Sequence, residues 1–467
     1  MRIRRSSWSL ATMLAMAAVV TSVFLGVAQP PSTGASTNDS SWTVYHGDAL
    51  DTGFSSVLRS VTTTKRAWTS PELSGEIYGE PLVYSSDVFV ATENDTVYAL
   101  SAANGSVVWK RHLATAVPSS ELPCGNISPS VGITGTPVID PSRAEIFIVA
   151  DEFKGGHPEH FLVGLNTKNG ALELRERVDP AGSDPAALLQ RTGLNLDGGR
   201  VVFAMGGNYD DCSPYRGRVI SVREGGSAPD IFTVDERAGD SQGAIWMGGA
   251  APVVDAKGNV WVSVGNGSVH SAGQAYDDSD SVLELSSTER LEQYFAPSSW
   301  ASDNASDYDM TTAPVLLADG QVVVAGKSPT VYLLNRARLG GIGNQEASLS
   351  SVCSNDIDGG SAIVGATVYL PCLNGPVALH TSKSPASMRV LWSASVGGGP
   401  PIVAAGLVWT VGKNGVLYGL DAATGNIRQQ ASVGTLANDF TTPSVGDGLL
   451  LLASSYRVVA FRGVPSS

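Results

Sequence analysis

The stretch "VYALSAANGSVVW", Val97–Trp109, alternates apolar residues, passes through a polar turn with a glycine, and becomes extended again. It returns as "LYGLDAATGNIRQ", Leu417–Gln429, with five of thirteen residues identical. Two looser copies are "LVGLNTKNGALEL" (162–174) and "VYLLNRARLGG" (331–341). A period of two on both sides of a glycine turn predicts a β-hairpin. The chain is therefore built from a repeated hairpin.

A second landmark, a proline that opens an apolar strand, precedes the copies. It occurs at Pro81, Pro137, Pro252, Pro314, Pro401 and Pro443. Two of the gaps are about twice as long as the others, and they hold strand-like stretches from Thr192 and from Gly359. We therefore expect eight units of about four short strands each, which predicts an all-β, eight-bladed β-propeller of four-stranded antiparallel blades. A parallel β-helix is the alternative, but its repeats are usually much shorter.

The last unit, which ends at Gly463, is one strand short. The N-terminal "KRAWTSPEL", Lys65–Leu73, resembles the strands that end other units, "VVWKRHL" and "VLWSASV". We expect it to supply the missing outer strand and to close the ring, because closure removes free strand edges.

The N-terminus has the pattern of an export signal. Three arginines precede an uncharged apolar run that ends in small residues, so we assign 1–28 to a signal peptide, 29–41 to a linker and 42–467 to the propeller. An uncleaved membrane anchor is the alternative for the same run. With cleavage, we expect a secreted or cell-envelope protein with no membrane span in the mature chain, present as a monomer.

Charge and cysteines narrow the possible partners. The chain has 30 Lys and Arg and 44 Asp and Glu, and removal of the three leader arginines gives 27 − 44 = −17. Such a surface repels phosphate backbones, so we exclude nucleic acid as a partner. Four cysteines in an exported chain predict two disulfides, with three possible pairings. We favour the local pair Cys353–Cys372, which leaves Cys124–Cys212.

The repeat resembles the blade repeat of the pyrroloquinoline quinone (PQQ) type, in which glycine sets the turn and tryptophan docks one blade on the next. The resemblance covers about Trp68 to Gly463. The family contains both quinoprotein alcohol dehydrogenases and non-catalytic propellers such as the outer-membrane assembly lipoprotein. The resemblance therefore implies the fold more strongly than any chemistry.

If the chain is a quinoprotein, the resemblance implies specific residues for PQQ and calcium. In "GAIWMGGAAPVVDAKGNVWVSVGNG", Trp246 would be the floor on which the quinone stacks, and Asn266 a calcium ligand. In "SDYDMTTAPVLL", Asp307 would be the catalytic base and a metal ligand. Lys327 would approach the quinone oxygens.

Asp210 and Asp211 precede Arg216-Gly217 where the family has a glutamate ligand, so Asp211 is a further candidate metal ligand. The chain also departs from the family. Ser306 stands where a tryptophan is usual, aspartate replaces the glutamate, and the adjacent cysteine pair and a haem-binding CxxCH motif are absent.

Two hypotheses follow. The first is an exported enzyme that binds PQQ and Ca²⁺ at the propeller centre, oxidises a small alcohol and passes electrons to an external acceptor. The second is a non-catalytic propeller that binds a protein or cell-envelope ligand through its loops.

Overall fold

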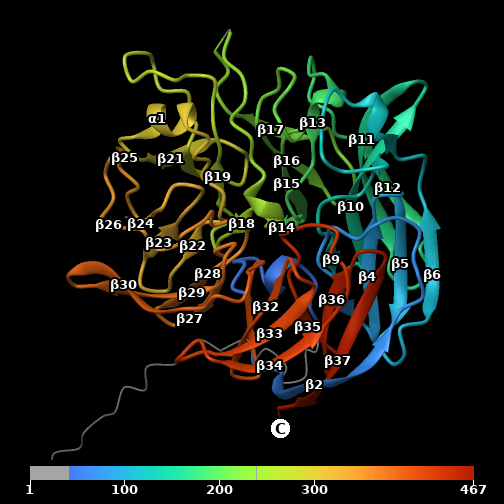
Figure 1. Ribbon diagram of the computed structural model, residues 1–467. Helices are drawn as coiled ribbons and strands as arrows, with labels where there is room; N and C mark the ends of the chain where they lie inside the picture. Colours follow the sequence, from blue (N-terminus) through green and yellow to red (C-terminus); the bar gives the residue numbers. More distant parts are fainter. Residues whose placement is uncertain (1–40, 238, 467) are drawn as a thin grey trace, which may run out of the picture. The chain divides into compact units, whose positions relative to one another are not determined.

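The computed structural model describes residues 41–237 and 239–466. The proposed signal peptide and nearly all of the linker lie outside the described residues. Eight sheets of short antiparallel strands form the eight blades of a β-propeller (Figure 1), as the repeat predicts. The described residues contain one short α-helix, α1 (Trp300–Ala305), and no helix long and apolar enough to cross a membrane.

Each blade is a meander from the innermost strand at the ring axis to the outermost strand. Blade 1 consists of β3 (Leu82–Tyr84), β4 (Asp87–Thr92), β5 (Thr96–Ser101) and β6 (Val107–His112), and blade 2 of β9 (Val138–Asp140), β10 (Glu145–Lys154), β11 (His157–Asn166) and β12 (Leu172–Arg177). Blade 3 consists of β14 (Asn195–Asp197), β15 (Arg200–Gly207), β16 (Arg218–Arg223) and β17 (Asp230–Thr233), and blade 4 of β18 (Val253–Val254), β19 (Val260–Val264), β20 (Ser281–Leu285) and β21 (Leu291–Ala296).

Blade 5 consists of β22 (Val315–Leu316), β23 (Gln321–Val324), β24 (Thr330–Asn335) and β26 (Ala347–Ser350), and blade 6 of β27 (Ala362–Val364), β28 (Thr367–Leu370), β29 (Val377–Lys383) and β30 (Ala386–Ser393). Blade 7 consists of β31 (Ile402–Ala404), β32 (Leu407–Gly412), β33 (Val416–Asp421) and β34 (Ile427–Ser432), and blade 8 of β35 (Ser444–Gly446), β36 (Leu449–Ser454), β37 (Arg457–Pro465) and β2 (Leu58–Thr69).

Short additional elements lie between or beside the blades. They are β1 (Phe54–Ser55), β7 (Val117–Pro118), β8 (Ser130–Val131), β13 (Leu188–Leu189), β25 (Gly341–Ile342) and the 3₁₀ turns η1 (Tyr45–Gly47), η2 (Ser119–Glu121), η3 (Pro185–Ala187) and η4 (Met247–Gly249).

Ring closure follows the prediction. The N-terminal strand β2 pairs antiparallel with the C-terminal strand β37, with Trp68 opposite Ala460. The strand begins at Leu58, earlier than the expected Lys65. The apolar core is formed by the middle strands, whose residues are nearly all buried, and the large fully buried side chains include Trp261, Trp409 and Phe461.

Tryptophans on outer strands join consecutive blades. Trp68, Trp109 and Trp392 donate their indole N–H groups to carbonyl oxygens of the next blade, at 2.8, 2.8 and 3.0 Å. Each ring lies on the turn glycine of that blade: a Cβ added to Gly105 would lie 2.5 Å from Trp68 Cε3. Gly105 also has φ +74°, which a residue with a side chain rarely adopts. The repeated glycine is therefore required both by the turn and by the neighbouring ring.

Both disulfides have the expected pairing, Cys124–Cys212 and Cys353–Cys372. The first connects the segment between blades 1 and 2 to the β15–β16 loop of blade 3. The second connects the segment between blades 5 and 6 to the β28–β29 loop.

Residues 42–55 form a plug inside the ring, which the sequence pattern did not reveal. The blue segment containing η1 lies at the centre of the blades in Figure 1. Its backbone is hydrogen-bonded to the innermost strands of five blades, at Val83, Ile139, Val254, Ile363 and Val403.

Strand direction shows how the plug is oriented. Trp42 pairs antiparallel with Val83, whereas β1 pairs parallel with β31. The segment therefore enters and leaves at the end of the channel where the innermost strands finish, and η1 is its apex.

Buried polar contacts hold the plug. Glu80 accepts hydrogen bonds from Trp42 Nε1 at 3.0 Å and from the His46 N–H at 2.9 Å. Burial lowers the pKa of His46 to about 3, and its Nε2 lies 3.2 Å from Thr442 Oγ1. His46 is therefore neutral at ordinary pH and serves as a polar core residue.

Candidate functional site

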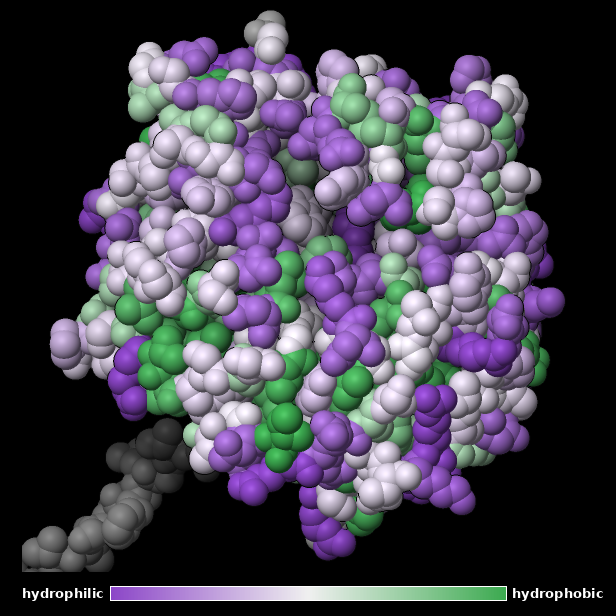
Figure 2. Space-filling view, viewed as in Figure 1, coloured by the Kyte–Doolittle hydropathy of each residue, from purple (hydrophilic) through white to green (hydrophobic). Residues whose placement is uncertain are grey.

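All five candidate residues lie in loops at one end of the ring. Trp246 and Asp307 lie in segments that connect an outermost strand to the next innermost strand, and Asp211, Asn266 and Lys327 lie in loops between second and third strands. In a meander these two kinds of connection occur at the same end of a blade. This is the end opposite the entrance of the plug. The space-filling view shows a recess lined by polar side chains near the middle of the ring (Figure 2).

Lys327 is the centre of the candidate site. Its Nζ lies 2.9 Å from Asp307 Oδ1 and 2.6 Å from Asp309 Oδ2. The backbone N–H of Lys327 donates to the Asp309 carbonyl at 2.9 Å, so the loop before β24 is tied to the loop before β22. Two carboxylates from the segment before β22 thus share one ammonium group.

Asn266 joins this cluster from blade 4. Its Nδ2 donates to Asp307 Oδ1 at 2.7 Å, and its backbone N–H donates to Asp309 Oδ1 at 2.6 Å. Its amide oxygen Oδ1 is buried and has no hydrogen-bond partner. A buried amide oxygen without a partner is unfavourable, and it is a ligand that Ca²⁺ accepts.

Exposure separates the two aspartates. The Asp307 side chain is 75% exposed, whereas that of Asp309 is 10% exposed and that of Lys327 20%. Asp309 is therefore a buried counter-ion that fixes the lysine, and Asp307 is the carboxylate that a molecule in solution can reach. Asp307 also has φ +57°, a conformation that is uncommon outside glycine and that is often found at functional sites.

The carboxylates determine the charge state of the lysine. Burial alone would lower the pKa of Lys327, but the attraction of Asp309 and Asp307 outweighs it and holds that pKa above the ordinary lysine value. Lys327 is consequently a permanent cation across the physiological pH range.

Asp211 belongs to the same electrostatic environment. Desolvation raises the pKa of its carboxyl, a hydrogen bond with Tyr215 opposes this, and the charges of Asp309, Lys327 and Asp307 all act on it. Asp211 immediately precedes Cys212 in the sequence, so the Cys124–Cys212 disulfide fixes the loop that carries Asp211.

Trp246 contacts the cluster through its ring. Lys327 Nζ lies 5.7 Å from the Trp246 ring centroid, within cation–π range. The Phe440 ring packs edge-on against Trp246, with ring centroids 5.8 Å apart. Trp246 immediately precedes η4, where a Cβ on Gly248 would lie 2.5 Å from the Gly359 N, so this loop packs closely against the loop of blade 6.

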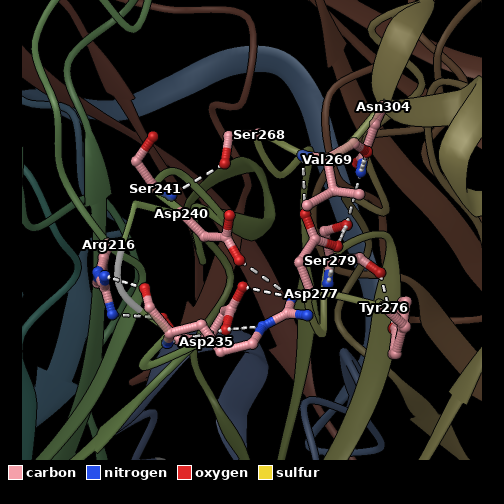
Figure 3. A network of polar contacts seen from close by, with 11 residues as sticks. Arg216, Asp235, Asp240, Ser241, Ser268, Val269, Tyr276, Asp277, Ser279 and Asn304 are labelled. Atoms are coloured by element: carbon pink, nitrogen blue, oxygen red, sulfur yellow. Dashed lines mark hydrogen bonds and ion pairs between the residues drawn. The ribbon is translucent and has the colours of Figure 1, made fainter. Parts of the chain in front are cut away.

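A buried polar network, shown in Figure 3, supports the Asn266 loop. Asn304 Oδ1 accepts the Gly267 N–H at 2.8 Å, while its Nδ2 donates to the Val269 carbonyl at 2.7 Å and to Ser279 Oγ at 2.8 Å. Asn304 lies in α1, three residues before Asp307. It therefore couples the loop that carries Asn266 to the segment that carries Asp307.

Sequence reasoning gave no role to Asp309 and missed Asn304. Asp309 lies in the same quoted "SDYD" motif as Asp307, so the motif itself was a usable signal. Asn304 contributes through burial and tertiary contacts, for which a single sequence carries no signal.

The residues present fit the proposed groups in part. Trp246 with Lys327 provides an aromatic face and a fixed cation, which suits a flat anionic quinone, and the unpartnered Asn266 Oδ1 suits a hard cation. No group of three or more His, Cys, Asp or Glu side chains that could hold a metal occurs within the described ranges. A calcium site here would need the Asn266 amide oxygen together with Asp307 and Asp211.

The fold and the repeat define a PQQ-repeat β-propeller. The family model described as outer membrane protein assembly factor BamB matches residues 55–338, and the chain belongs to this family. No curated protein matches the chain.

Solved structures share the fold at low sequence identity. Quinohemoprotein alcohol dehydrogenase from Comamonas testosteroni has 14% identity and a TM-score of 0.68, covering 90% of this chain and 80% of the other. A europium-containing methanol dehydrogenase has 13% identity and a TM-score of 0.67, covering 90% of each chain. BamB from Moraxella catarrhalis has 14% identity and a TM-score of 0.56, covering 86% of this chain and 100% of the other.

Proposed function

We propose that this chain is an extracytoplasmic quinoprotein-like oxidoreductase that binds PQQ and Ca²⁺ at the loop end of the ring and oxidises an alcohol. The observation that carries the proposal is the Lys327 ammonium, which lies between Asp307 and Asp309 and 5.7 Å from the Trp246 ring centroid. A stacking surface, a fixed cation and an accessible carboxylate are thereby combined in one place. The fold shared with dehydrogenases supports this reading only as an analogy.

Each residue would have a separate role. Trp246 would support the quinone plane, and Lys327 would stabilise negative charge on the quinone oxygens. Asn266 Oδ1, with Asp307 and Asp211, would hold calcium. Bound PQQ would supply the two-electron acceptor for the alcohol carbon, and Asp307, the exposed carboxylate, would accept the hydroxyl proton. An external protein or small molecule would then take the electrons.

The second candidate is a non-catalytic scaffold in the cell envelope. The observation in its favour is the family model described as BamB, which spans more than half of the chain. In this case the loops would bind a protein or envelope ligand, and the Lys327 cluster would only connect blades 4 and 5.

Direct titration tests the enzyme proposal. Protein beginning at residue 41 is incubated with PQQ and Ca²⁺, and quinone absorbance, calcium dependence and dye reduction with a panel of alcohols are measured. We expect the unmodified protein to bind the quinone. Asp307→Asn should retain most of this binding, while its turnover falls at least about 100-fold, the lower end of the range for loss of a general base. Lys327→Gln should weaken quinone binding itself.

Lys413→Gln is the matched control. Lys413 lies in the β32–β33 loop of blade 7, the position that Lys327 has in blade 5, and pairs with Asp439 at 2.5 Å. It should leave binding and turnover unchanged. Absence of quinone binding to the unmodified protein would reject the enzyme and leave the scaffold.

A further inference from the structure

Arg191 is a buried cation at the loop end of the ring, and it forms no ion pair with any described residue. It lies in the segment before β14, its residue is at most 9% exposed, and its Nη2 is buried without a hydrogen-bond partner. Burial lowers the pKa of its guanidinium, and Glu93 is the main opposing charge. A buried unpaired guanidinium is costly, so it indicates either a strained core or a missing ligand.

Glu93 is engaged elsewhere through one carboxylate oxygen, while its Oε1 is buried without a hydrogen-bond partner. Its Oε2 accepts the Gly132 N–H at 2.8 Å and the Thr134 hydroxyl at 3.1 Å. Burial raises the pKa of Glu93 to about 7, so near neutral pH it is only partly charged. Glu93 therefore compensates the Arg191 charge incompletely, without a direct ion pair or hydrogen bond between them.

Aromatic rings surround the guanidinium. The Arg191 Cζ lies 5.3 Å from the Phe440 centroid and 5.9 Å from the Tyr78 centroid. Both rings are only half-buried, whereas the guanidinium is buried, so the aromatic groups are the part that solvent reaches. Phe440 is also the ring that packs against Trp246.

The backbone is shaped around this cation. A Cβ at Gly249 would lie 2.5 Å from Arg191 Nη1, so glycine lets the η4 turn after Trp246 approach the guanidinium closely. The turn that follows Trp246 therefore bounds Arg191 on one side.

We infer that Arg191 is the carboxylate-binding residue of a site for a planar aromatic anion, with Phe440, Tyr78 and Trp246 as the surrounding faces. Guanidinium groups bind carboxylates through two parallel hydrogen bonds, which would satisfy Nη2. The carboxylate could belong to a quinone cofactor or to a separate aromatic acid. The inference does not require the chain to be an enzyme.

Calorimetry with two probes tests the site. One is PQQ, and the other is 1-naphthoate, compared with the uncharged 1-naphthylmethanol. We expect PQQ, 1-naphthoate or both to bind. Where 1-naphthoate binds, its affinity should be at least tenfold higher than that of 1-naphthylmethanol. Arg191→Met should weaken the carboxylate at least tenfold, and Arg191→Lys should retain part of the affinity.

Controls separate this result from misfolding and from the proposed function. Arg336→Met removes a partly buried arginine that, unlike Arg191, is paired with a carboxylate, that of Asp255 at 2.7 Å, and should leave carboxylate binding unchanged. Thermal melts of all variants report folding, with Arg191→Lys as the conservative substitution. Naphthoate binding without dye reduction would leave this inference intact while the enzyme proposal fails. Equal carboxylate binding by the unmodified protein and Arg191→Met, or no binding of either probe, would overturn it.

Discussion

Gln429 of β34 donates its side-chain amide to the Val61 carbonyl of β2 at 2.6 Å, and so connects blade 7 to the strand that closes the ring. The amide oxygen accepts the Thr63 N–H at 3.0 Å and the Thr63 hydroxyl at 3.1 Å. Gln429 occupies the repeat position that Trp109 has in blade 1. The repeat therefore changed from an aromatic contact to a hydrogen-bonded one at the blade beside the closure.

Replacement of Gln429 by alanine should weaken the closure. Because Thr63 is buried, its N–H would lose its partner, and we expect a loss of about 1–3 kcal/mol in the free energy of unfolding. Hydrogen exchange of the β2 amides should accelerate more than that of β10. Gln430→Ala, at the exposed neighbouring position, should do neither. Unchanged β2 exchange in Gln429→Ala would contradict this role.

Substitution of the turn glycine tests the contact between blades. Gly105→Ala places a methyl group 2.5 Å from Trp68 Cε3 and strains a backbone with φ +74°. Gly155→Ala carries a similar backbone cost at φ +64° but meets nothing within 4 Å. We expect Gly105→Ala to cost about 1–3 kcal/mol more than Gly155→Ala in chemical denaturation. Equal losses would show that the tryptophan contact contributes nothing.

The sequence predicted the blades because they repeat local chemistry. The period-two pattern, the turn glycine and the proline before six of the eight innermost strands are all readable within a few residues. The outer strand at Lys65–Leu73 was readable because it resembles its counterparts. The plug at 42–55 resembles nothing else in the chain, and its contacts are with residues far away in sequence, so no local pattern reveals it.

For the candidate site too, the residues were predictable from the sequence but their contacts were not. Motif order indicated Trp246, Asn266, Asp307 and Lys327 as a set, and the contacts among them come from tertiary structure. Asp309, not Asp307, is the buried partner of the lysine. The two aspartates lie in the same loop and differ only in exposure, which the sequence does not show.

Asn304 should control the order of the Asn266 loop. Asn304→Ala removes the acceptor of the Gly267 N–H and the donors to Val269 and Ser279, all in a buried network. We expect faster hydrogen exchange at residues 267–269 and a loss of about 1–3 kcal/mol in stability. Ser302→Ala, at an exposed position of the same helix, is the control. Protected amides at 267–269 in the Asn304 variant would refute the coupling.

Stability should fall as the pH rises from about 5 to about 7. Burial raises the pKa of Glu93, Asp151, Asp358, Glu224 and Glu289 to about 7. In the unfolded chain such groups lose their protons near pH 4, so in this window the folded state binds more protons and stability decreases with pH. His46, with its pKa lowered to about 3, acts in the opposite direction but is a single group.

Asp358→Asn isolates one of these carboxyls. Asparagine cannot titrate, so the slope of unfolding free energy against pH between 5 and 7 should become shallower, by at most about 1.4 kcal/mol per pH unit. Urea denaturation at pH 5, 6 and 7 measures the slope. Asp421→Asn removes an exposed carboxylate whose pKa is lowered by Arg428 and should leave the slope in this window unchanged. An unchanged slope for Asp358→Asn would show that this carboxyl is already ionised at pH 5.

The two disulfides should differ in their contribution to stability. Cys124–Cys212 closes a loop with a sequence separation of 88, and Cys353–Cys372 one of 19. Chain entropy predicts that removing the longer link costs about 1 kcal/mol more, within an overall range of about 2–5 kcal/mol for each bond. Serine pairs at each site, compared by urea denaturation, measure the difference. Since Cys212 follows Asp211, the first pair should also speed hydrogen exchange in the β15–β16 loop, and the second should not. A larger loss from the Cys353–Cys372 pair would show that native-state contacts of that bond outweigh the loop entropy.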